Sequence, residues 1–370
     1  MKFSCSQQTL TKALNIVSKA VTIRTTIPIL KGILLKVDNN GILTMSASDL
    51  DLSIEKKIKV ENFTPGETVV LSKLFGDIIR KLPDGIITIE ETDGKVNIKC
   101  SNSEFNIIGL SADEFPNINP NEENSEELVF NKEILKDMIK KTAFSASIDE
   151  NKGAMTGVLI EMEENSLNMI AIDGFRMAIA REHMKNKKKE NIIIPAKILG
   201  EISRIITESE VSSEDVTMLL SEKKAVFIME NTKIVIRLLD GEFMNYKRII
   251  PQENPCRVVL NKNDFLESVE RASLLAKVGK NNLIRLEIKD NNIEITSKSE
   301  EGNVKEEVNV SKEGNDLTIG FNSKYLIDVL KVVDDEEILM LFNTNVSPCL
   351  VKPVSEDKFE YLILPVRISQ

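Results

Sequence analysis

Ser72-Lys73-Leu74-Phe75-Gly76-Asp77-Ile78-Ile79-Arg80-Lys81-Leu82 is the stretch that decides the fold, because the chain contains it three times in altered form. The second copy is Ala196-Lys197-Ile198-Leu199-Gly200-Glu201-Ile202-Ser203-Arg204-Ile205-Ile206, and the third is Ser323-Lys324-Tyr325-Leu326-Ile327-Asp328-Val329-Leu330-Lys331-Val332-Val333. The copies align without gaps, and a run rich in β-branched residues precedes each of them. A repeat at this spacing indicates an internally duplicated architecture.

A second trio of amphipathic helices lies upstream of the first. Its apolar positions are Leu10, Leu14 and Val17, then Leu135, Ile139 and Thr142, and less closely Phe265, Val269 and Ala272. The strand-like segment 32–37 matches 157–162 in the same way. We therefore predict an α+β fold of three tandem copies, each with two helices and antiparallel strands. Loop-forming residues at 116–124 and 251–255 place the domains at 1–125, 126–253 and 254–370.

Each helix of the first trio carries a charged stripe. On a helical wheel Lys73, Asp77 and Arg80 share one side, and the apolar residues share the other, namely Leu74, Phe75, Ile78, Ile79 and Leu82. The stripe returns as Lys197, Glu201 and Arg204, and as Lys324, Asp328 and Lys331. For one helix alone, a solvated face with ion pairs one turn apart is the ordinary explanation.

The charge is distributed unevenly between these helices and the rest of the chain. The 370 residues include 48 Lys plus Arg and 58 Asp plus Glu, for a formal net charge of −10. The six helical segments together carry +9, so the remainder carries −19; the segments are 7–20, 72–82, 131–147, 196–206, 261–280 and 322–333. Such segregation suits a protein that confines a polyanion to one surface and repels it elsewhere.

Helix dimensions then limit how such a surface could surround DNA. Six helices spaced ~9 Å apart around a ring leave a gap of only ~7 Å, which is narrower than a major groove. Twelve helices leave a clear bore of ~24 Å, which is wide enough for a duplex. Two copies of the chain could therefore encircle DNA, whereas one could not.

Other residues argue against several function classes. Cys5, Cys100, Cys256 and Cys349 are far apart, and His183 is the only histidine, so a zinc ribbon or a multi-histidine metal site is not expected. Neither GxGxxG nor GxxxxGK[ST] occurs. We predict no enzyme activity and no cofactor. The chain shows no apolar run of 18 residues and no signal-peptide pattern at its start, so we expect a cytoplasmic protein that does not bind membranes.

Several motifs resemble one family when taken in order. They are Ile27-Pro28-Ile29-Leu30, Ala171-Ile172-Asp173-Gly174-Phe175-Arg176-Met177-Ala178, Ile193-Ile194-Pro195-Ala196-Lys197, Leu239-Asp240-Gly241-Glu242-Phe243-Met244-Asn245-Tyr246-Lys247-Arg248-Ile249-Ile250-Pro251, Ser268-Val269-Glu270-Arg271-Ala272-Ser273, and Tyr361-Leu362-Ile363-Leu364-Pro365-Val366-Arg367. Over its full length the chain resembles the bacterial replicative sliding clamps, the beta subunits of DNA polymerase III.

The resemblance implies a DNA clamp fold and a processivity factor without a catalytic site. Two chains would form a head-to-tail homodimer, a ring of six similar domains around double-stranded DNA, bound without sequence preference. The implied protein partners are the DNA polymerase III catalytic subunit, the clamp loader, and other polymerases and repair proteins that carry clamp-binding motifs.

The resemblance also implies three sets of site residues. The DNA contacts would be Arg24 and Lys73, with Lys12, Arg80, Lys152, Lys197 and Arg204 as further candidates. A hydrophobic peptide-binding pocket would comprise Met155, Ile172, Gly174, Phe175, Arg176, Met177, Met244, Arg248, Ile249, Val346, Pro348, Leu362, Leu364, Pro365, Val366 and Arg367. The dimer interface would join Lys95, Lys99 and Phe105 of one chain to Leu274, Leu275, Glu300, Glu301, Glu306 and Glu307 of the other.

Alternatives remain at this point. The apolar pocket residues could be ordinary core, and the glutamates could be a solvated surface run. The whole chain could be a scaffold that binds peptides and never encircles DNA. A hydrolase could use the carboxylates of 149–150 or 334–337, although no nucleophile or metal ligand is evident beside them.

Overall fold

The computed structural model of the chain describes residues 1–22, 24–118, 125–186, 189–208, 213–279 and 281–368. The chain divides into two compact units. Unit 1 consists of Met1–Leu135 and Glu201–Leu238, and unit 2 consists of Lys136–Gly200 and Leu239–Gln370. Part of the predicted loop at 116–124 and the last residue of the predicted helix at 261–280 lie outside the described residues.

Unit 1 contains two antiparallel sheets. The first has the order β5-β1-β7-β8-β9 and the second the order β10-β15-β16-β17-β4-β3-β2-β6. The strands of the first sheet are β1 (Lys2–Ser6), β5 (Glu61–Thr64), β7 (Ile86–Thr92), β8 (Lys95–Cys100) and β9 (Ser103–Ile108). Those of the second are β2 (Gly32–Val37), β3 (Ile42–Ser48), β4 (Leu52–Lys59), β6 (Gly66–Leu71), β10 (Glu126–Asn131), β15 (Asp215–Leu220), β16 (Lys224–Met229) and β17 (Thr232–Arg237).

Unit 2 is also built on two antiparallel sheets. Their orders are β14-β11-β12-β13-β26-β25-β24-β18-β22 and β21-β20-β19-β23. The larger sheet consists of β11 (Gly157–Glu163), β12 (Ser166–Ile172), β13 (Arg176–Glu182), β14 (Glu190–Pro195), β18 (Cys256–Asn261), β22 (Ser311–Gly314), β24 (Glu337–Phe342), β25 (Cys349–Pro353) and β26 (Phe359–Ile363). The smaller sheet consists of β19 (Leu283–Lys289), β20 (Asn292–Ser299), β21 (Gly302–Asn309) and β23 (Leu317–Asn322).

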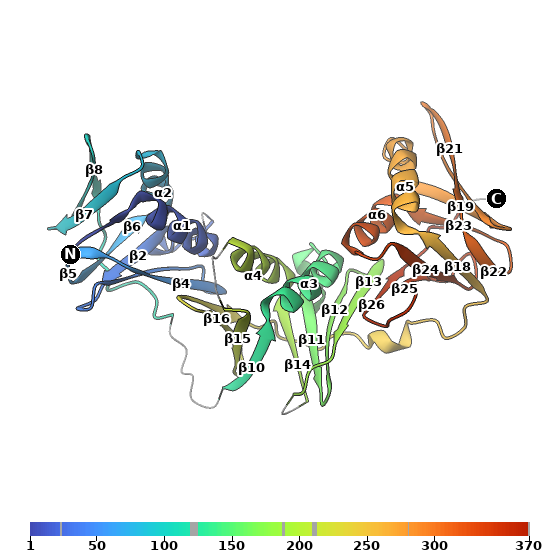
Figure 1. Ribbon diagram of the computed structural model, residues 1–370, viewed down its shortest axis with the longest axis horizontal. Helices are drawn as coiled ribbons and strands as arrows, with labels where there is room; N and C mark the ends of the chain where they lie inside the picture. The colour runs from blue at the N-terminus through green and yellow to red at the C-terminus, as the bar shows by residue number, and fades with distance from the viewer. Residues whose placement is uncertain (23, 119–124, 187–188, 209–212, 280, 369–370) are drawn as a thin grey trace. The chain divides into compact units, whose positions relative to one another are not determined.

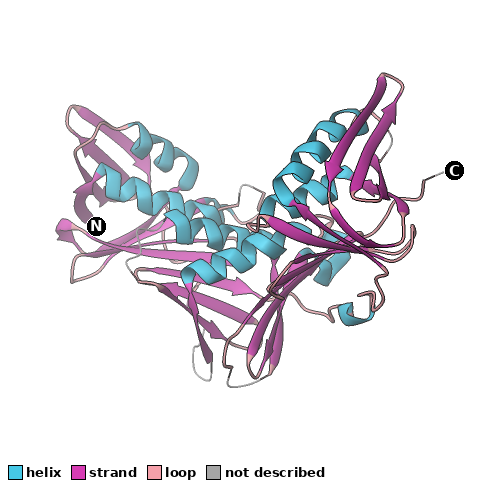
Figure 2. Cartoon of the chain, turned by 45° about the vertical axis from the view of Figure 1, so that its right-hand side comes forward, coloured by secondary structure: helices cyan, strands magenta, loops and turns pink. Residues whose placement is uncertain are grey.

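The α-helices form in the predicted places. They are α1 (Gln7–Val17), α2 (Ser72–Lys81), α3 (Lys132–Thr142), α4 (Ala196–Glu208), α5 (Lys262–Ala276) and α6 (Ser323–Val332). The three copies thus contain α1 with α2, α3 with α4, and α5 with α6 (Figure 1). In the first and third copies the two α-helices lie side by side against the strands (Figure 2). This confirms the predicted α+β fold of three two-helix, antiparallel-sheet copies. None of the helices in the described ranges is long and apolar enough to span a membrane.

Side-chain oxygens determine where several helices begin. The Ser6 hydroxyl accepts a hydrogen bond from the Thr9 amide at the start of α1. Asn261 and Asn322 cap α5 and α6 through their side-chain oxygens. Each of these bonds satisfies an amide that has no partner within its helix.

The helical wheel predicts the buried face of α2 with one exception. Phe75, Ile78 and Ile79 are buried, as is Leu82 just after the helix, whereas Leu74 is 49% exposed. Leu74 lies at the edge of the apolar arc, where a side chain turns toward solvent when no neighbouring element covers it. The prediction that Leu74 belongs to the apolar side is therefore wrong in part.

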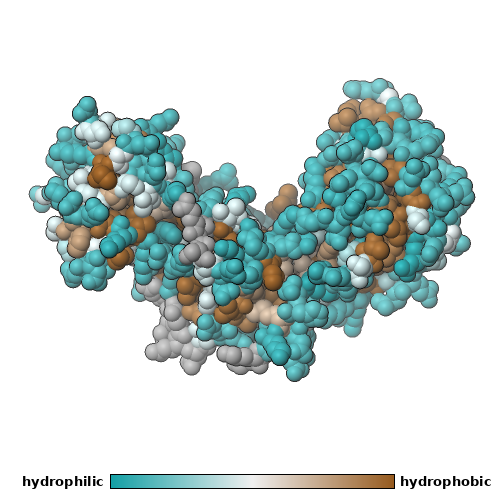
Figure 3. All heavy atoms as spheres, in the orientation of Figure 1, coloured by the Kyte–Doolittle hydropathy of each residue, from teal (hydrophilic) through white to brown (hydrophobic). Residues whose placement is uncertain are grey.

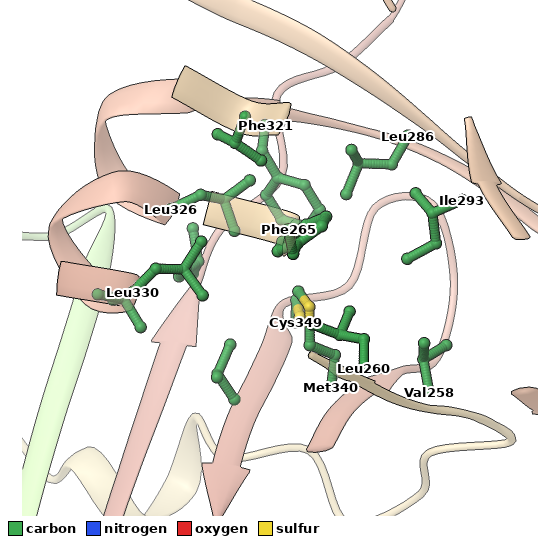
Figure 4. Packing of buried hydrophobic residues seen from close by; sticks show 14 of the residues in the cluster. Val258, Leu260, Phe265, Leu286, Ile293, Phe321, Leu326, Leu330, Met340 and Cys349 are labelled. Atoms are coloured by element: carbon green, nitrogen blue, oxygen red, sulfur yellow. The ribbon is translucent and has the colours of Figure 1, made fainter. Parts of the chain in front are cut away.

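A dense core fills the third copy. Phe265 from α5 lies near Leu326 from α6 and Phe321 from β23, and the sheet residues Met340 and Cys349 close the far side (Figure 4). All five side chains are at most 1% exposed. Burial of apolar surface on this scale is what holds the helix pair onto its sheets. The four cysteines of the chain are all buried and free.

Neighbouring copies are joined by strand pairing. In unit 1, β4 of the first copy pairs antiparallel with β17 of the second copy. In unit 2, β13 of the second copy pairs antiparallel with β26 of the third copy. The pairing makes one continuous sheet across each junction. By contrast, β9 of the first copy and β21 of the third are end strands, with one edge unpaired among the described strands.

Candidate functional site

The β13–β26 junction of unit 2 carries a cluster of apolar side chains on one face of the sheet. Ile172 and Met177 from the second copy and Leu362 from the third are each at most 2% exposed. Other members come from both copies, namely Leu159, Ile170, Ile179, Ile193, Tyr246, Leu341 and Leu350. The cluster forms a continuous apolar floor that spans the junction.

Large apolar side chains around this floor remain in contact with solvent. Phe175 is 54% exposed, Val346 62%, and Met244 and Leu364 37% each. Figure 3 shows, on one face of the chain, hydrophobic residues gathered in patches among hydrophilic ones. An apolar floor with exposed apolar residues around it is typical of a surface that binds a partner, rather than of core. For these four residues the core interpretation is therefore wrong.

Arg176 is the centre of a polar network beneath the rim, as we call the exposed apolar residues around the floor. Its side chain is only 8% exposed. Its Nε donates to Asp173 Oδ2 at 3.0 Å, Nη1 donates to Asp328 Oδ2 at 2.6 Å, and Nη2 donates to the Phe144 carbonyl at 2.8 Å. The guanidinium also lies over the rings of Phe144 and Tyr325. Because Asp328 belongs to α6, these bonds fasten the second copy to the third in a fixed geometry.

Phe175 is held in place by its neighbours although half of it is exposed. Its ring stacks on Tyr325 with centroids 6.1 Å apart and an interplanar angle of 20°. The Lys152 ammonium lies 5.6 Å from the Phe175 ring centroid and donates to the Asp173 carbonyl at 2.7 Å. The Phe175 carbonyl accepts a hydrogen bond from the Leu364 amide. The exposed ring is thus presented in a defined orientation.

The segment that connects the second and third copies forms one wall of the site. It begins where the Leu239 amide donates to the Ile193 carbonyl, and it contains the short helix η5 (Tyr246–Arg248). Tyr246 points into the floor and is 6% exposed, whereas Lys247 and Arg248 are exposed. Ile249 is partly buried against the apolar floor.

Glu161 on β11 anchors that wall. Its carboxylate is 7% exposed and accepts hydrogen bonds from Tyr246 Oη at 2.8 Å, Lys247 Nζ at 3.0 Å and Asn168 Nδ2 at 3.0 Å. Burial acts to raise the pKa of Glu161, but the hydrogen bonds from Lys247, Tyr246 and Asn168 outweigh it and lower the pKa. Burial, together with the Glu161 charge, raises the pKa of the Tyr246 phenol.

The structure places the remaining predicted pocket residues in different ways. Met155, Pro348 and Pro365 are partly buried, and Gly174, Arg248 and Arg367 are exposed. Val366 is partly buried because its amide donates to the Gly320 carbonyl of β23. The chain therefore turns onto the third copy directly after Leu364.

The stripe residues at the start of the first helix trio have the same exposure in each copy. Lys73, Lys197 and Lys324 are all exposed at the second position of their helices. The acids behind them are neutralised: Asp77 pairs with Arg80 at 2.9 Å and Glu201 with Arg204 at 2.7 Å. These ion pairs reduce the net positive charge that the two helices offer.

The other predicted DNA contacts lie in different surroundings. Arg24 is exposed in the segment after α1, and Lys12 is exposed on α1. Lys152 is exposed as well, but its ammonium is bonded at the rim beside Phe175. Within unit 2, the Lys152 ammonium is therefore engaged by Asp173 and the Phe175 ring.

A cavity of about 580 Å³ opens beside the start of α2 in unit 1. Two basic side chains, an acid, and small polar and aliphatic residues line it, namely Ser18, Val21, Thr22, Lys31, Leu71, Ser72, Lys73, Leu74 and Asp77. The partly exposed Leu74 therefore faces a hollow rather than bulk surface alone.

The predicted interface residues lie on or beside the two end strands. Phe105 on β9 is 40% exposed, and Leu274 near the end of α5 is 66% exposed. Glu306 pairs with Arg271 at 2.8 Å, and this hydrogen bond lowers the pKa of Glu306; Glu307 pairs with Lys305. Among the described residues, Lys95, Glu300 and Glu301 make no ion pair within the chain, whereas Lys99 pairs with Glu104.

Three family models match the chain in sequence order. The N-terminal, central and C-terminal domains of the DNA polymerase III beta subunit match residues 1–119, 129–245 and 247–367. The chain belongs to the DNA polymerase III beta subunit family. The resemblance inferred from the motifs is confirmed, and so is the threefold duplication.

Named relatives agree with this family over the whole chain. The beta sliding clamp of Bacillus subtilis (strain 168) is 34% identical over 381 residues, covering 99% of this chain and 100% of that protein. That of Halalkalibacterium halodurans is 37% identical over 385 residues with the same coverage. The crystal structure of a putative DNA polymerase III beta subunit from Eubacterium rectale matches with a TM-score of 0.93 and 39% identity, covering 100% of both chains.

Sequence reasoning missed several residues of this beta-subunit site. Tyr325 beneath Phe175, Phe144 against Arg176, and Glu161 beneath the linker were not expected there. Tyr325 had a signal, because it is the aromatic residue at the place of Leu74 and Ile198 in the repeated helix. Glu161 had none, because its two partners in the linker are 85 and 86 residues further along the chain.

Proposed function

We propose that two copies of this chain join head to tail into a ring of six repeats around double-stranded DNA. The ring tethers the replicative polymerase and other DNA-processing proteins through a hydrophobic peptide pocket. The single observation that supports ring closure best is the register shared by the two junctions within the chain.

The registers of the two junctions are compared by locating each paired residue within the β-hairpin to which its strand belongs. Ile54 of β4 lies opposite Ile234 of β17, and Ala178 of β13 lies opposite Tyr361 of β26. Ile54 and Ala178 occupy equivalent hairpin places, opposite Ala47 and Ala171. Ile234 and Tyr361 are likewise equivalent, opposite Phe227 and Val351. Both junctions therefore pair the same two edge strands of the repeat in the same register.

The end strands β9 and β21 are the remaining members of the same two sets. Val304 on β21 occupies the place of Ile54 and Ala178, and Phe105 on β9 occupies the place of Ile234 and Tyr361. A third junction in the same register sets Phe105 opposite Val304 of a second copy. Glu104 then faces Lys305, which places opposite charges across the strands. Two such junctions close a symmetric dimer without leaving either edge open.

The cavity beside α2 fits the same arrangement. In unit 2, Phe175 in the β12–β13 turn stacks on Tyr325 of α6, and Arg176 directly after the turn pairs with Asp328. Leu74 and Asp77 take those two places on α2, where the cavity lies. The turn of Glu300 and Glu301 from a second copy would occupy it. Lys31 and Lys73 would then meet the two glutamates that have no partner within the described chain.

Paired cysteines test this register. Phe105→Cys with Val304→Cys should give a covalent dimer of about twice 41.5 kDa on mild oxidation, since opposite Cα atoms in antiparallel strands lie about 4.5–5.5 Å apart. Phe105→Cys with Lys305→Cys is the matched control, because neighbouring strand residues point to opposite faces. Equal cross-linking of both pairs, or none in either, contradicts the proposed junction.

DNA encirclement is tested with the same variant. When it is oxidised in the presence of circular duplex DNA, the covalent ring should stay with the circle at high salt and leave once the circle is cut. A peptide-binding scaffold, the alternative function, would show no difference between circular and linear DNA. The basic stripe supports a sliding contact, because a few phosphate contacts attract DNA without fixing the protein at one place.

The peptide pocket is supported by a comparison of the junctions themselves. The floor residues Ile170, Ile172 and Met177 in unit 2 correspond to Ser46, Ser48 and Ser53 at the junction in unit 1. There the hydroxyls of Ser48 and Ser53 bond to each other at 2.7 Å. Only the junction between the second and third copies therefore has an apolar floor that suits a peptide, and its Met residues can adapt to several partners.

Further parts of the proposal follow from family membership. The protein acts as a non-catalytic processivity factor in the cytoplasm, and a clamp loader and repair proteins share its pocket. Its DNA contacts are Arg24, Lys73 and the weaker candidates named above. Its domains divide at 1–125, 126–253 and 254–370, close to the ranges that the three family models match.

A further inference from the structure

The buried carboxylate of Glu161 has no part in the contacts proposed so far, yet three side chains converge on it. It lies on β11, beneath the linker that joins the second and third copies. Its oxygens accept from Tyr246, Lys247 and Asn168 within 3.0 Å, and it is 7% exposed. A buried carboxylate with three donors is a strong and directional anchor.

Two of those donors belong to the linker, and residues of the proposed pocket lie on either side of them along the chain. Tyr246 and Lys247 lie in η5, between Met244 and Ile249. The helix η5 has a single turn, so its own backbone hydrogen bonds hold it weakly. The position of Met244 and Ile249 at the pocket therefore depends on how firmly Tyr246 and Lys247 are fixed to the sheet.

The other copies show that this anchor is not a general feature of the fold. The strand position of Glu161 is occupied by Lys36 in the first copy and Glu287 in the third. Lys36 is exposed and pairs with Glu67, and Glu287 pairs with Arg285 and Lys289. Among the described residues, only the copy whose junction has an apolar floor ties this strand position to the following linker.

We propose that Glu161 is a positioning residue of the peptide pocket, which holds the linker wall at the distance that a bound peptide requires. The inference rests on the proposed function of that pocket. Glu161 itself does not touch the peptide: it acts through Tyr246 and Lys247. Loss of the carboxylate should loosen the wall and leave the apolar floor unchanged.

Peptide affinity tests the proposal directly. The probe is a fluorescent decapeptide from the C-terminal tail of the cognate polymerase catalytic subunit, titrated into the full-length protein. Glu161→Ala should weaken binding about 10-fold to 100-fold, since each lost hydrogen bond to a charged group matters at this scale. Glu161→Gln keeps an acceptor for Tyr246 and should recover much of the affinity. Glu163→Gln is the matched control, because Glu163 lies on the same strand and, among the described residues, pairs with Lys189 on the surface.

A second readout separates positioning from general loss of stability. The chain has no Trp, so Met244→Trp places a single reporter on the wall. Adding Glu161→Ala should shift its emission to the red and speed amide exchange at 244–250 in the free protein. Unchanged affinity, or weaker binding with unchanged emission and exchange, overturns the role of Glu161. Absence of peptide binding by the unsubstituted chain contradicts the proposed function instead.

Discussion

The Arg176 network gives the sharpest stability prediction. Arg176→Met keeps the aliphatic part of the side chain and removes all three hydrogen bonds, including the 2.6 Å bond to Asp328. Removal of one partner from a buried ion pair costs about 3–5 kcal/mol. The Asp328 side chain is 28% exposed, so water recovers part of this loss and the lower end, about 3 kcal/mol, applies. Unit 2 should therefore melt about 6–12 °C lower.

Differential scanning calorimetry of the full chain measures this shift. Arg204→Met is the matched control, because Arg204 makes a 2.7 Å ion pair with Glu201 while its side chain is 67% exposed. An exposed pair one turn apart on a helix contributes at most about 0.5 kcal/mol to stability, so the melting temperature of the Arg204→Met variant should hardly differ from that of the unsubstituted chain. If the two variants melt at the same temperature, the Arg176 network does not fasten the junction.

Four further outcomes are expected. Truncation before Leu364 should abolish binding of the polymerase-tail peptide and leave the mass of the proposed dimer unchanged in light scattering, because the removed segment belongs to the proposed pocket and not to β9 or β21. Leu274→Glu with Leu275→Glu should give a monomer near 41.5 kDa, since two charges would face the proposed interface. Because folding lowers the pKa of Glu161, its contribution to stability is present above the pKa of the unfolded chain and is lost as the pH falls through the lower, folded value. Glu161→Gln should therefore flatten the acid side of a stability–pH profile. Lys73→Ala should reduce the slope of log affinity for duplex DNA against log salt by about one, whereas an unchanged slope removes Lys73 from the contact surface.

Local sequence patterns predicted the helices well. The start of α2 at Ser72, of α4 at Ala196 and of α6 at Ser323 agrees with the aligned repeat to the residue. These helices depend on the spacing of apolar residues, which is read from neighbouring positions. Leu74 was the exception, because its exposure depends on what covers α2 and not on α2 itself.

The sequence predicted which residues lie at the candidate site, but not which side chains contact one another there. The resemblance supplied Phe175, Arg176 and Leu364, and the structure brings them together at one junction. It could not supply the partners beneath them. Asp328 is 152 residues from Arg176, and Glu161 is 85 residues from Tyr246, so no local pattern relates them. Such pairs arise only once strand pairing has brought distant segments together.

One position of the repeated helix shows that equivalent residues in duplicated copies can have different roles. The acid four residues after the stripe lysine is present in all three copies, which suggests one shared role. In the first two copies it pairs with an arginine one turn later on its own helix. In the third copy that basic residue is Lys331, which pairs with Glu270 instead, so Asp328 remains available for Arg176. Glu201 also pairs with Lys19 of the first copy at 3.5 Å. The same carboxylate thus moderates the charge of two helices, one of which it also links to the neighbouring copy, and in the third it fastens the junction that carries the apolar floor. A repeated pattern therefore identifies equivalent places, whereas the partners of each place decide what it does.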